Sequence, residues 1–274
     1  MNKVANLLAT ASTALIMFSL PASADETKLS PLAGQASASY TTRSSDYTAL
    51  SEFKTNTIAV QASALYRLDH NLNLQIDYAN HEHDGDDVTP FSTWHLGAGI
   101  FSRTSDLLLG LTGQTGKTRN ETRNFAEHYS FGPTLEVYQS NTTLGATASY
   151  SKMDYGAPYV LKSYQGQVYG KFYTSDNLAL TLSGNYGNGE LQSADWKTYG
   201  AFAEAEYAYN NASVFVRTEF TSYETDSIDL DDKQAVVGLR IYLNSDDTNI
   251  KSLHRSTTIN NTNVMLENSF FSWY

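Results

Sequence analysis

The sequence predicts an all-β fold, an up-and-down antiparallel β-barrel, and three observations support this prediction. Apolar and polar residues alternate over segments of about ten residues, as in 72–78, and a period of two is that of a strand with two unlike faces. No helical pattern separates these segments between Leu32 and Leu243. Short turns and longer polar connections alternate strictly between them, which is typical of a barrel with short turns at one end and longer loops at the other.

The connections give the number of strands. Five short turns are built from residues that favour turn conformations, at 69–71, 104–106, 140–142, 175–177 and 210–211. Six longer connections lie around 43–54, 84–93, 119–127, 154–158, 187–195 and 225–233. These connections imply about twelve strands, near 32–42, 55–68, 72–83, 94–103, 107–118, 127–139, 143–153, 159–174, 178–188, 196–209, 212–224 and 234–244. Ten or fourteen strands are the alternatives, because strand boundaries drawn from one sequence shift by a few residues.

The strands have one apolar face and one polar face. The apolar face carries Ile58, Val60, Ala62, Ala64, Tyr66, Leu72, Leu74, Ile76, Tyr78, Trp94, Leu96, Ala98, Ile100, Leu107, Leu109, Leu111, Val237, Leu239, Ile241 and Leu243. The polar face carries charges that we expect to line a pore, namely Asp77, Glu136, Lys171, Glu204, Arg217, Glu219 and Arg240. In the hairpin 196–224, a two-residue turn at Asn210-Asn211 places Glu204 opposite Arg217.

Two architectures share this alternation, a transmembrane barrel and a secreted soluble β-sandwich. Aromatic residues such as Tyr129, Tyr150 and Tyr207 occur near strand ends on the apolar face, as in the aromatic girdles of membrane barrels. Charges at mid-strand fit a water-filled lumen, and sequential hairpins fit an up-and-down barrel more than a Greek-key sandwich. In a bilayer, only closure of the sheet satisfies every strand edge. These features favour the membrane barrel.

The ends and the composition indicate an exported protein. Residues 1–24 read as a signal peptide, with Lys3 before an apolar run and an Ala-x-Ala site at Ala22 to Ala24. The barrel is then expected over 25–244, and residues 245–274 are expected to form a periplasmic tail or an extra strand. Without the signal peptide the chain has 17 basic and 29 acidic residues, a net charge of −12, which argues against nucleic acid as a partner. The chain has no cysteine, so disulfides and Cys metal sites are excluded.

With these features the chain resembles porin-like outer-membrane β-barrel proteins of Gram-negative bacteria. The resemblance covers 32–243 and rests on pattern. The segment 237–243 is similar to the terminal strand by which the barrel-assembly machinery recognises such proteins, although 31 residues follow it here. The resemblance implies insertion in the outer membrane, contact with its lipid and lipopolysaccharide, and passage through the assembly machinery.

Histidines offer the one candidate site for a metal ion. His81 and His83 lie on one face of a strand below an acidic connection, and His95 on the next strand shares that face. Two or three imidazoles with carboxylates could bind Zn²⁺, Ni²⁺ or Cu²⁺; the alternative is a polar loop base whose histidines only titrate. His128 and Ser130 are the candidates for a Ser–His hydrolase, but no nucleophile motif surrounds them. We therefore predict no catalytic residue, no cofactor and no enzyme.

Two further motifs have simpler explanations. The acidic segment 226–232 lacks the spacing of a calcium loop and is expected to be a solvated loop, or to bridge lipopolysaccharide through divalent cations. The segment 110–118 has the spacing of a phosphate-binding loop, with Gly110, Gly116, Lys117 and Thr118. That motif requires a following helix and a parallel sheet, so in an alternating strand it is a chance match.

The sequence as a whole predicts a monomeric barrel that lets small polar solutes or ions diffuse passively. Barrels of about eight strands are filled by side chains, whereas 16–18 strands leave a wide channel, and twelve lies between them. A non-conducting barrel that presents loops at the cell surface is the first alternative. An outer-membrane lipid hydrolase is the second.

Overall fold

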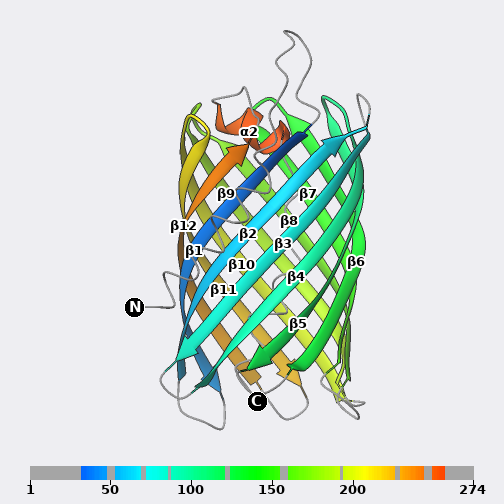
Figure 1. The fold of residues 1–274 in the computed structure, drawn as a ribbon, viewed down its shortest axis with the longest axis vertical. Coiled ribbons are helices and arrows are strands. Elements are labelled where there is room, and N and C mark those ends of the chain that lie inside the picture. Colours follow the sequence, from blue (N-terminus) through cyan, green and yellow to red (C-terminus); the bar gives the residue numbers. More distant parts are fainter. Residues whose placement is uncertain are drawn as a thin grey trace.

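Twelve antiparallel strands close into a barrel in the part of the chain that the structure, a computed structural model, describes (Figure 1). That part comprises residues 32–47, 53–68, 72–85, 88–120, 124–154, 160–191, 194–225, 229–243 and 249–256. Each strand pairs with its neighbours in sequence, and β1 pairs with β12 to complete the barrel. The prediction of an up-and-down barrel with twelve strands is confirmed, and the soluble sandwich is excluded.

Most strands are longer than the sequence pattern indicates, whereas β8 is two residues shorter than its predicted span of 159–174. Their bounds are β1 (Leu32–Tyr47), β2 (Phe53–Arg67), β3 (Leu72–Gly85), β4 (Val88–Arg103), β5 (Leu107–Asn120), β6 (Asn124–Gln139), β7 (Thr142–Asp154), β8 (Val160–Tyr173), β9 (Leu178–Leu191), β10 (Ala194–Tyr209), β11 (Ala212–Thr225) and β12 (Asp229–Leu243). The extra residues lie mostly at the end of the long connections, where polar sequence still forms ladder pairs such as Ser45 with Asp232. Backbone pairing with a neighbour on each side, and not side-chain hydrophobicity, extends the strands there.

The acidic segment expected as a loop is therefore partly strand. Asp229 to Asp232 begin β12, and Asp232 points into the barrel because side chains alternate along a strand. Residues 226–228 lie outside the described residues, as do the signal peptide region and the turn at 69–71. The segment with phosphate-loop spacing lies in β5, with β6 and no helix as its successor, so the chance-match interpretation agrees with the fold.

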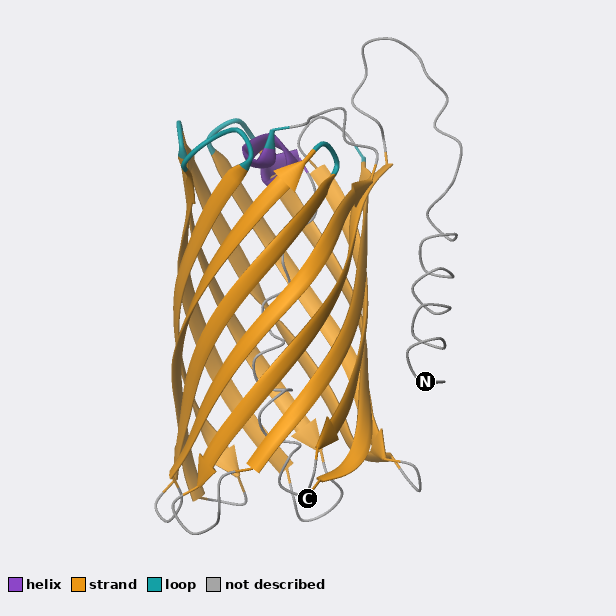
Figure 2. Cartoon of the chain, turned by 90° about the vertical axis from the view of Figure 1, so that its left-hand side faces the viewer, coloured by secondary structure: helices purple, strands orange, loops and turns teal. Residues whose placement is uncertain are grey.

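The short turns gather at one end of the barrel, which we call the short-turn end (Figure 2). Thr104 and Ser175 each accept hydrogen bonds from nearby backbone N–H groups, as turn residues with hydroxyls do. Asn210 has a φ of 55°, a left-handed conformation that asparagine tolerates better than most residues. The turn at 210–211 fixes the register of β10 and β11.

The outer surface of the barrel is apolar. Large exposed hydrophobic side chains from all parts of the sheet include Leu74, Ile76, Leu96, Ile100, Leu109, Leu111, Leu135, Leu144, Val168, Leu180, Leu182, Val214, Val216, Val237 and Leu239. Exposed tyrosines stand toward the ends of this belt, and the rings of Tyr150 and Tyr164 lie 5.2 Å apart between centroids. An apolar band flanked by aromatic residues is the lipid-facing surface of a membrane barrel.

A short helix follows the last strand. Helix α2 (Ile250–Ser256) lies at the short-turn end, inside the ring of strand ends (Figures 1 and 2). The sequence predicted a tail or a further strand for 245–274; of this segment the structure describes 249–256, in which residues 250–256 form the helix and no residue forms a strand. No helix among the described residues is long and apolar enough to cross a membrane.

Candidate functional site: the barrel lumen

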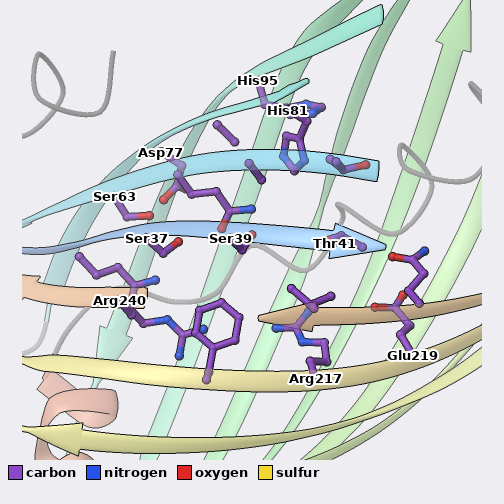
Figure 3. A pocket seen from close by; sticks show the side chains of 18 of the residues that line it. Ser37, Ser39, Thr41, Ser63, Asp77, His81, His95, Arg217, Glu219 and Arg240 are labelled. Carbon is purple, nitrogen blue, oxygen red and sulfur yellow. The ribbon is translucent and has the colours of Figure 1, made fainter. Parts of the chain in front are cut away.

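The inward face of the barrel is polar and encloses a cavity of about 190 Å³ (Figure 3). Serine and threonine hydroxyls of β1 and β2 line one part of the wall, and Arg240 of β12 with Arg217 and Glu219 of β11 line the adjoining part, because β1 pairs with β12 and β12 with β11. Asp77, His81 and His95 complete the lining beside the hydroxyls. Such side chains replace part of the hydration shell of a polar solute, which an apolar wall cannot do.

An alternating ladder of charges crosses β10, β11 and β12. Arg217 donates hydrogen bonds from Nε and Nη2 to Glu204 Oε2, at 2.9 and 2.6 Å. Arg240 forms an ion pair with Glu206 and lies 3.8 Å from Glu204 Oε1. Glu206 also accepts hydrogen bonds from the hydroxyls of Ser213 and Tyr242. Each of these carboxylates is nearly buried, and pairing is what makes such burial tolerable.

A second charged cluster lies close to the short-turn end. Glu136 accepts hydrogen bonds from Tyr138 at 2.9 Å and Tyr169 at 2.5 Å, and Lys171 Nζ lies 3.8 Å from it. Arg103 Nε donates to the hydroxyl of Tyr138 at 3.1 Å. The Tyr169 ring lies over Gly145, where a side chain would occupy its space. The polar contacts of this cluster thus join β4, β6 and β8 on the inward face.

A third ion pair stands near the opposite end. Arg43 of β1 donates to Asp232 of β12 at 2.7 Å, and Ser45 also hydrogen-bonds to Asp232. The two charged residues are 189 positions apart in the chain and meet because β1 and β12 close the barrel. This pair therefore ties the closing seam on the inner side.

Four histidines form a row on the inward face of β3, β4 and β6. The ring centroids of His81 and His95 are 5.6 Å apart, and His95 Nδ1 lies 2.6 Å from His128 Nε2. Thr57 Oγ1 lies 2.9 Å from His83 Nδ1. Gly116 makes room for this row, because a Cβ there would lie 2.5 Å from His128 Nε2.

This row includes the three residues predicted as metal ligands, His81, His83 and His95. The structure shows that His128 also belongs to the row. No group of three or more His, Cys, Asp or Glu side chains within the described ranges has an arrangement that could hold a metal ion. Metal binding by His81, His83 and His95 stays a prediction. His128 also figured in the weaker hydrolase hypothesis, and its Nε2 lies against His95 while Ser130 Oγ makes no hydrogen bond to it. The geometry around His128 is therefore not that of an activated serine.

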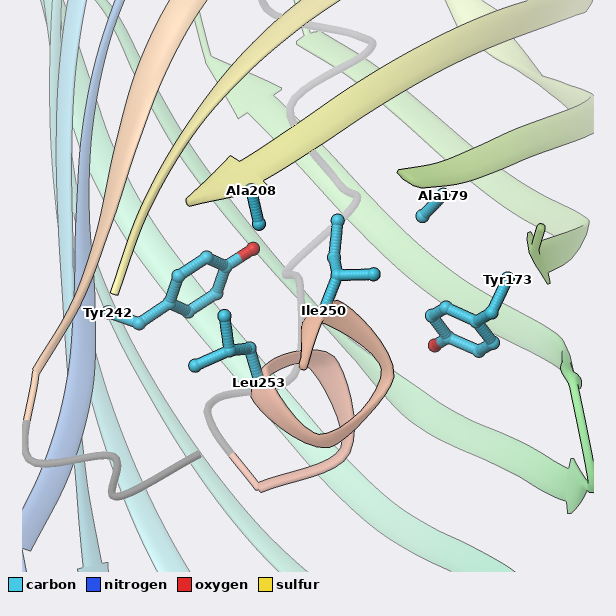
Figure 4. Packing of buried hydrophobic residues seen from close by; sticks show 6 residues of the cluster. All are labelled: Tyr173, Ala179, Ala208, Tyr242, Ile250 and Leu253. Carbon is cyan, nitrogen blue, oxygen red and sulfur yellow. The ribbon is translucent and has the colours of Figure 1, made fainter. Parts of the chain in front are cut away.

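Helix α2 occupies part of the mouth at the short-turn end (Figure 4). Ile250 and Leu253 are fully buried, and they pack against Tyr173, Ala179, Ala208 and Tyr242 of the barrel wall. Burial of an isoleucine or leucine side chain contributes about 1.5–3 kcal/mol each. Two such side chains give the seven-residue helix a stability that its length alone does not provide.

Polar contacts fasten the same helix to several turns. The Ile250 N–H donates to the carbonyl of Asp176 at 2.8 Å, and Lys251 Nζ donates to the carbonyl of Ser140 at 3.0 Å. Arg67 of β2 donates to the carbonyl of Ser256 at 2.9 Å, and His254 Nε2 lies 3.2 Å from Glu206 Oε2. Helix α2 is thus connected to both the turns and the charge ladder.

The structure places all seven predicted pore-lining residues on the inward face, distributed over different levels. Asp77, Arg217, Glu219 and Arg240 line the cavity, whereas Glu136 and Lys171 are outside its lining, close to the short-turn end. Glu204 is outside the cavity lining and forms an ion pair with Arg217, which is part of that lining. Their part in permeation stays a prediction.

Sequence reasoning missed Glu206, the Arg43–Asp232 pair and helix α2. Glu206 could have been found, because it is two residues from Glu204 and so shares its face. Arg43 and Asp232 were assigned to connections, where alternation no longer predicts a face. The two buried apolar residues of α2, three positions apart, were too weak a helical signal.

No family model and no curated protein matches the chain in sequence. Solved structures match in fold. An outer-membrane channel from Pseudomonas putida F1 aligns with a TM-score of 0.60 and 10% identity, over 82% of this chain and 99% of that one. The KdgM porin in complex with disordered oligogalacturonate aligns with a TM-score of 0.47 and 8% identity, over 74% and 98%. A loop-deletion mutant of OmpT, an outer-membrane protein of Vibrio cholerae, aligns with a TM-score of 0.43 and 13% identity, over 77% and 99%. The chain has the fold of a porin-like outer-membrane β-barrel.

Proposed function

We propose that this protein is an outer-membrane channel for the passive diffusion of small polar solutes or ions. The observation that carries the proposal is the polar cavity inside a closed barrel whose outer surface is apolar. The apolar belt matches lipid, and the hydroxyl, amide and charged side chains of the lumen match water and polar solutes. Twelve strands leave room for a narrow path and not for a wide one.

Helix α2 narrows this path at the short-turn end, which is the periplasmic end if the short turns face the periplasm. The helix also favours the second candidate, a non-conducting barrel that presents its longer connections at the cell surface. Both candidate functions imply a monomer that the assembly machinery inserts and that contacts lipid and lipopolysaccharide. The tests must therefore measure permeation itself.

Swelling of proteoliposomes tests the proposal directly. The full chain is refolded into vesicles, which are transferred to isotonic solutions of glycerol, a monosaccharide or a tetrasaccharide. We expect faster swelling than in protein-free vesicles for the smallest solute and none for the tetrasaccharide. Swelling equal to that of protein-free vesicles with every solute would favour the non-conducting barrel.

A further inference from the structure

The charges around the cavity do not cancel. Three arginines, Arg43, Arg217 and Arg240, reach the cavity, and each forms an ion pair with a carboxylate of the wall. The carboxylates of those pairs belong to Asp232, Glu204 and Glu206. Two more carboxylates line the cavity without any ion pair among the described residues, and they are Asp77 and Glu219. The wall around the cavity therefore carries an excess of two negative charges.

Neutral groups surround the first of these carboxylates. The Asp77 oxygens accept hydrogen bonds from Gln75 Nε2 at 2.7 and 2.9 Å, and Ser63 hydrogen-bonds to the same carboxylate. Amide and hydroxyl donors hold the carboxylate in place without cancelling its charge. Asp77 lies on the wall formed by β2 and β3, beside Ser63 (Figure 3).

Glu219 lies on β11, which β12, β1 and β2 separate from Asp77 on β3. Arg217 and Arg43 are its positive neighbours, yet each forms its ion pair with another carboxylate. The side chains of Ser37, Ser39 and Thr41 on β1 supply hydroxyl oxygens to the same cavity (Figure 3). Carboxylate and hydroxyl oxygens are the groups that replace the hydration shell of a small cation.

We propose that Asp77 and Glu219 make the lumen select small cations over anions. The inference rests on the proposed channel function and names the residues that determine its selectivity. A narrow, low-dielectric passage strengthens the effect of fixed charge on a permeating ion. The paired arginines hold the neighbouring carboxylates and contribute no net positive charge.

The test is the reversal potential of single channels across a gradient of KCl. We expect a permeability ratio of K⁺ to Cl⁻ of about 3 or more for the wild-type chain, given two fixed charges within a Debye length of the path. In the Asp77→Asn/Glu219→Gln double variant the ratio should fall to about 1, because both substitutions keep the shape and remove the charge. The permeability ratios of the two single variants should lie between those of the wild type and the double variant. The single variants provide the test if the double variant does not fold.

A matched control removes the same charge from outside the lumen. Glu190 and Asp195 are exposed cross-strand neighbours on the outward face of β9 and β10. The Glu190→Gln/Asp195→Asn variant should keep the wild-type ratio. A wild-type ratio of 1 or below, or an unchanged ratio in the Asp77 and Glu219 variants, would overturn the inference while leaving the channel intact. Absence of any conductance would remove the channel proposal and this inference together.

Discussion

The guanidinium of Arg255 donates a hydrogen bond to the carbonyl oxygen of Thr142 at 2.8 Å, which joins helix α2 to the turn between β6 and β7. The same guanidinium donates to Gln139 and lies 4.9 Å from the ring centroid of Tyr138. A cation–π contact of this kind stabilises an arginine whose aliphatic chain is buried and whose guanidinium is hydrogen-bonded. Arg255 thus adds a polar anchor for helix α2 to the burial of Ile250 and Leu253.

Release of this helix should increase the conductance of the channel. The Ile250→Asp/Leu253→Asp variant places two charges against Tyr173 and Tyr242, so the helix loses burial worth about 3 kcal/mol or more, roughly a hundredfold in the docking equilibrium. Single-channel recording should show larger unit currents than in the wild type. Ser252→Ala, on the same helix, should leave the current unchanged. A smaller or equal current in the double variant would show that α2 does not narrow the path.

Removal of Glu206 should destabilise the barrel. Glu206→Ala leaves Arg240 buried without its main partner and takes an acceptor from Tyr242, for an expected loss of about 3–5 kcal/mol in the free energy of unfolding. The midpoint of urea unfolding, followed by the heat-modifiable band on gels, measures the loss. Glu190→Ala, an exposed outward residue, should change stability by less than about 0.5 kcal/mol. Equal midpoints for the two variants would contradict the role of the charge ladder.

A methyl group at Gly116 should disturb the histidine row. Gly116→Ala brings a Cβ to 2.1 Å from the carbonyl oxygen of Trp94 and 2.5 Å from His128 Nε2, so both the β4 backbone and the ring must shift and the free energy of unfolding should fall by about 1–3 kcal/mol. Gly113 on the same strand is the control, since its nearest contact with an added Cβ is 3.5 Å from the carbonyl of Ser130. Imidazole signals in NMR spectra should move in Gly116→Ala only. If Gly113→Ala shifts them equally, the row is not positioned by Gly116.

Adjacent residues on β8 test which face meets lipid. Val168 is exposed on the outer face, and Gln167 lines the cavity. Val168→Arg should cost about 2–4 kcal/mol in a bilayer, the cost of an arginine on the lipid face near the midplane. Gln167→Arg should cost less, because the lumen is polar. Folding yields in lipid vesicles compare the two, and the opposite order would invert the assignment of the faces.

Much of the barrel could be predicted from the sequence because strand faces and hairpin register depend on residues close together in the chain. Alternation such as that at Leu107, Leu109 and Leu111 gives the outward face without any knowledge of the partners. A two-residue turn at 210–211 fixes the register of the hairpin, and the predicted opposition of Glu204 and Arg217 is confirmed.

The rest depends on closure and on long-range contacts. Arg43 meets Asp232 only because the first and last strands pair, and the turn contacts of α2 come from residues over 70 positions away. A helix of seven residues with two apolar positions has little propensity of its own. Helix α2 lies in the mouth because its apolar residues pack against the side chains of Tyr173 and Tyr242. No local sequence pattern indicates this packing.

Planar-bilayer recording of the refolded full chain tests the central claim most directly. In symmetrical salt we predict small, discrete current steps, as expected for a narrow polar path through a twelve-strand barrel. The steps should grow when Ile250 and Leu253 are replaced by aspartate. Protein that migrates on gels as a folded, heat-modifiable barrel and yet gives no steps, with or without those substitutions, would contradict the channel.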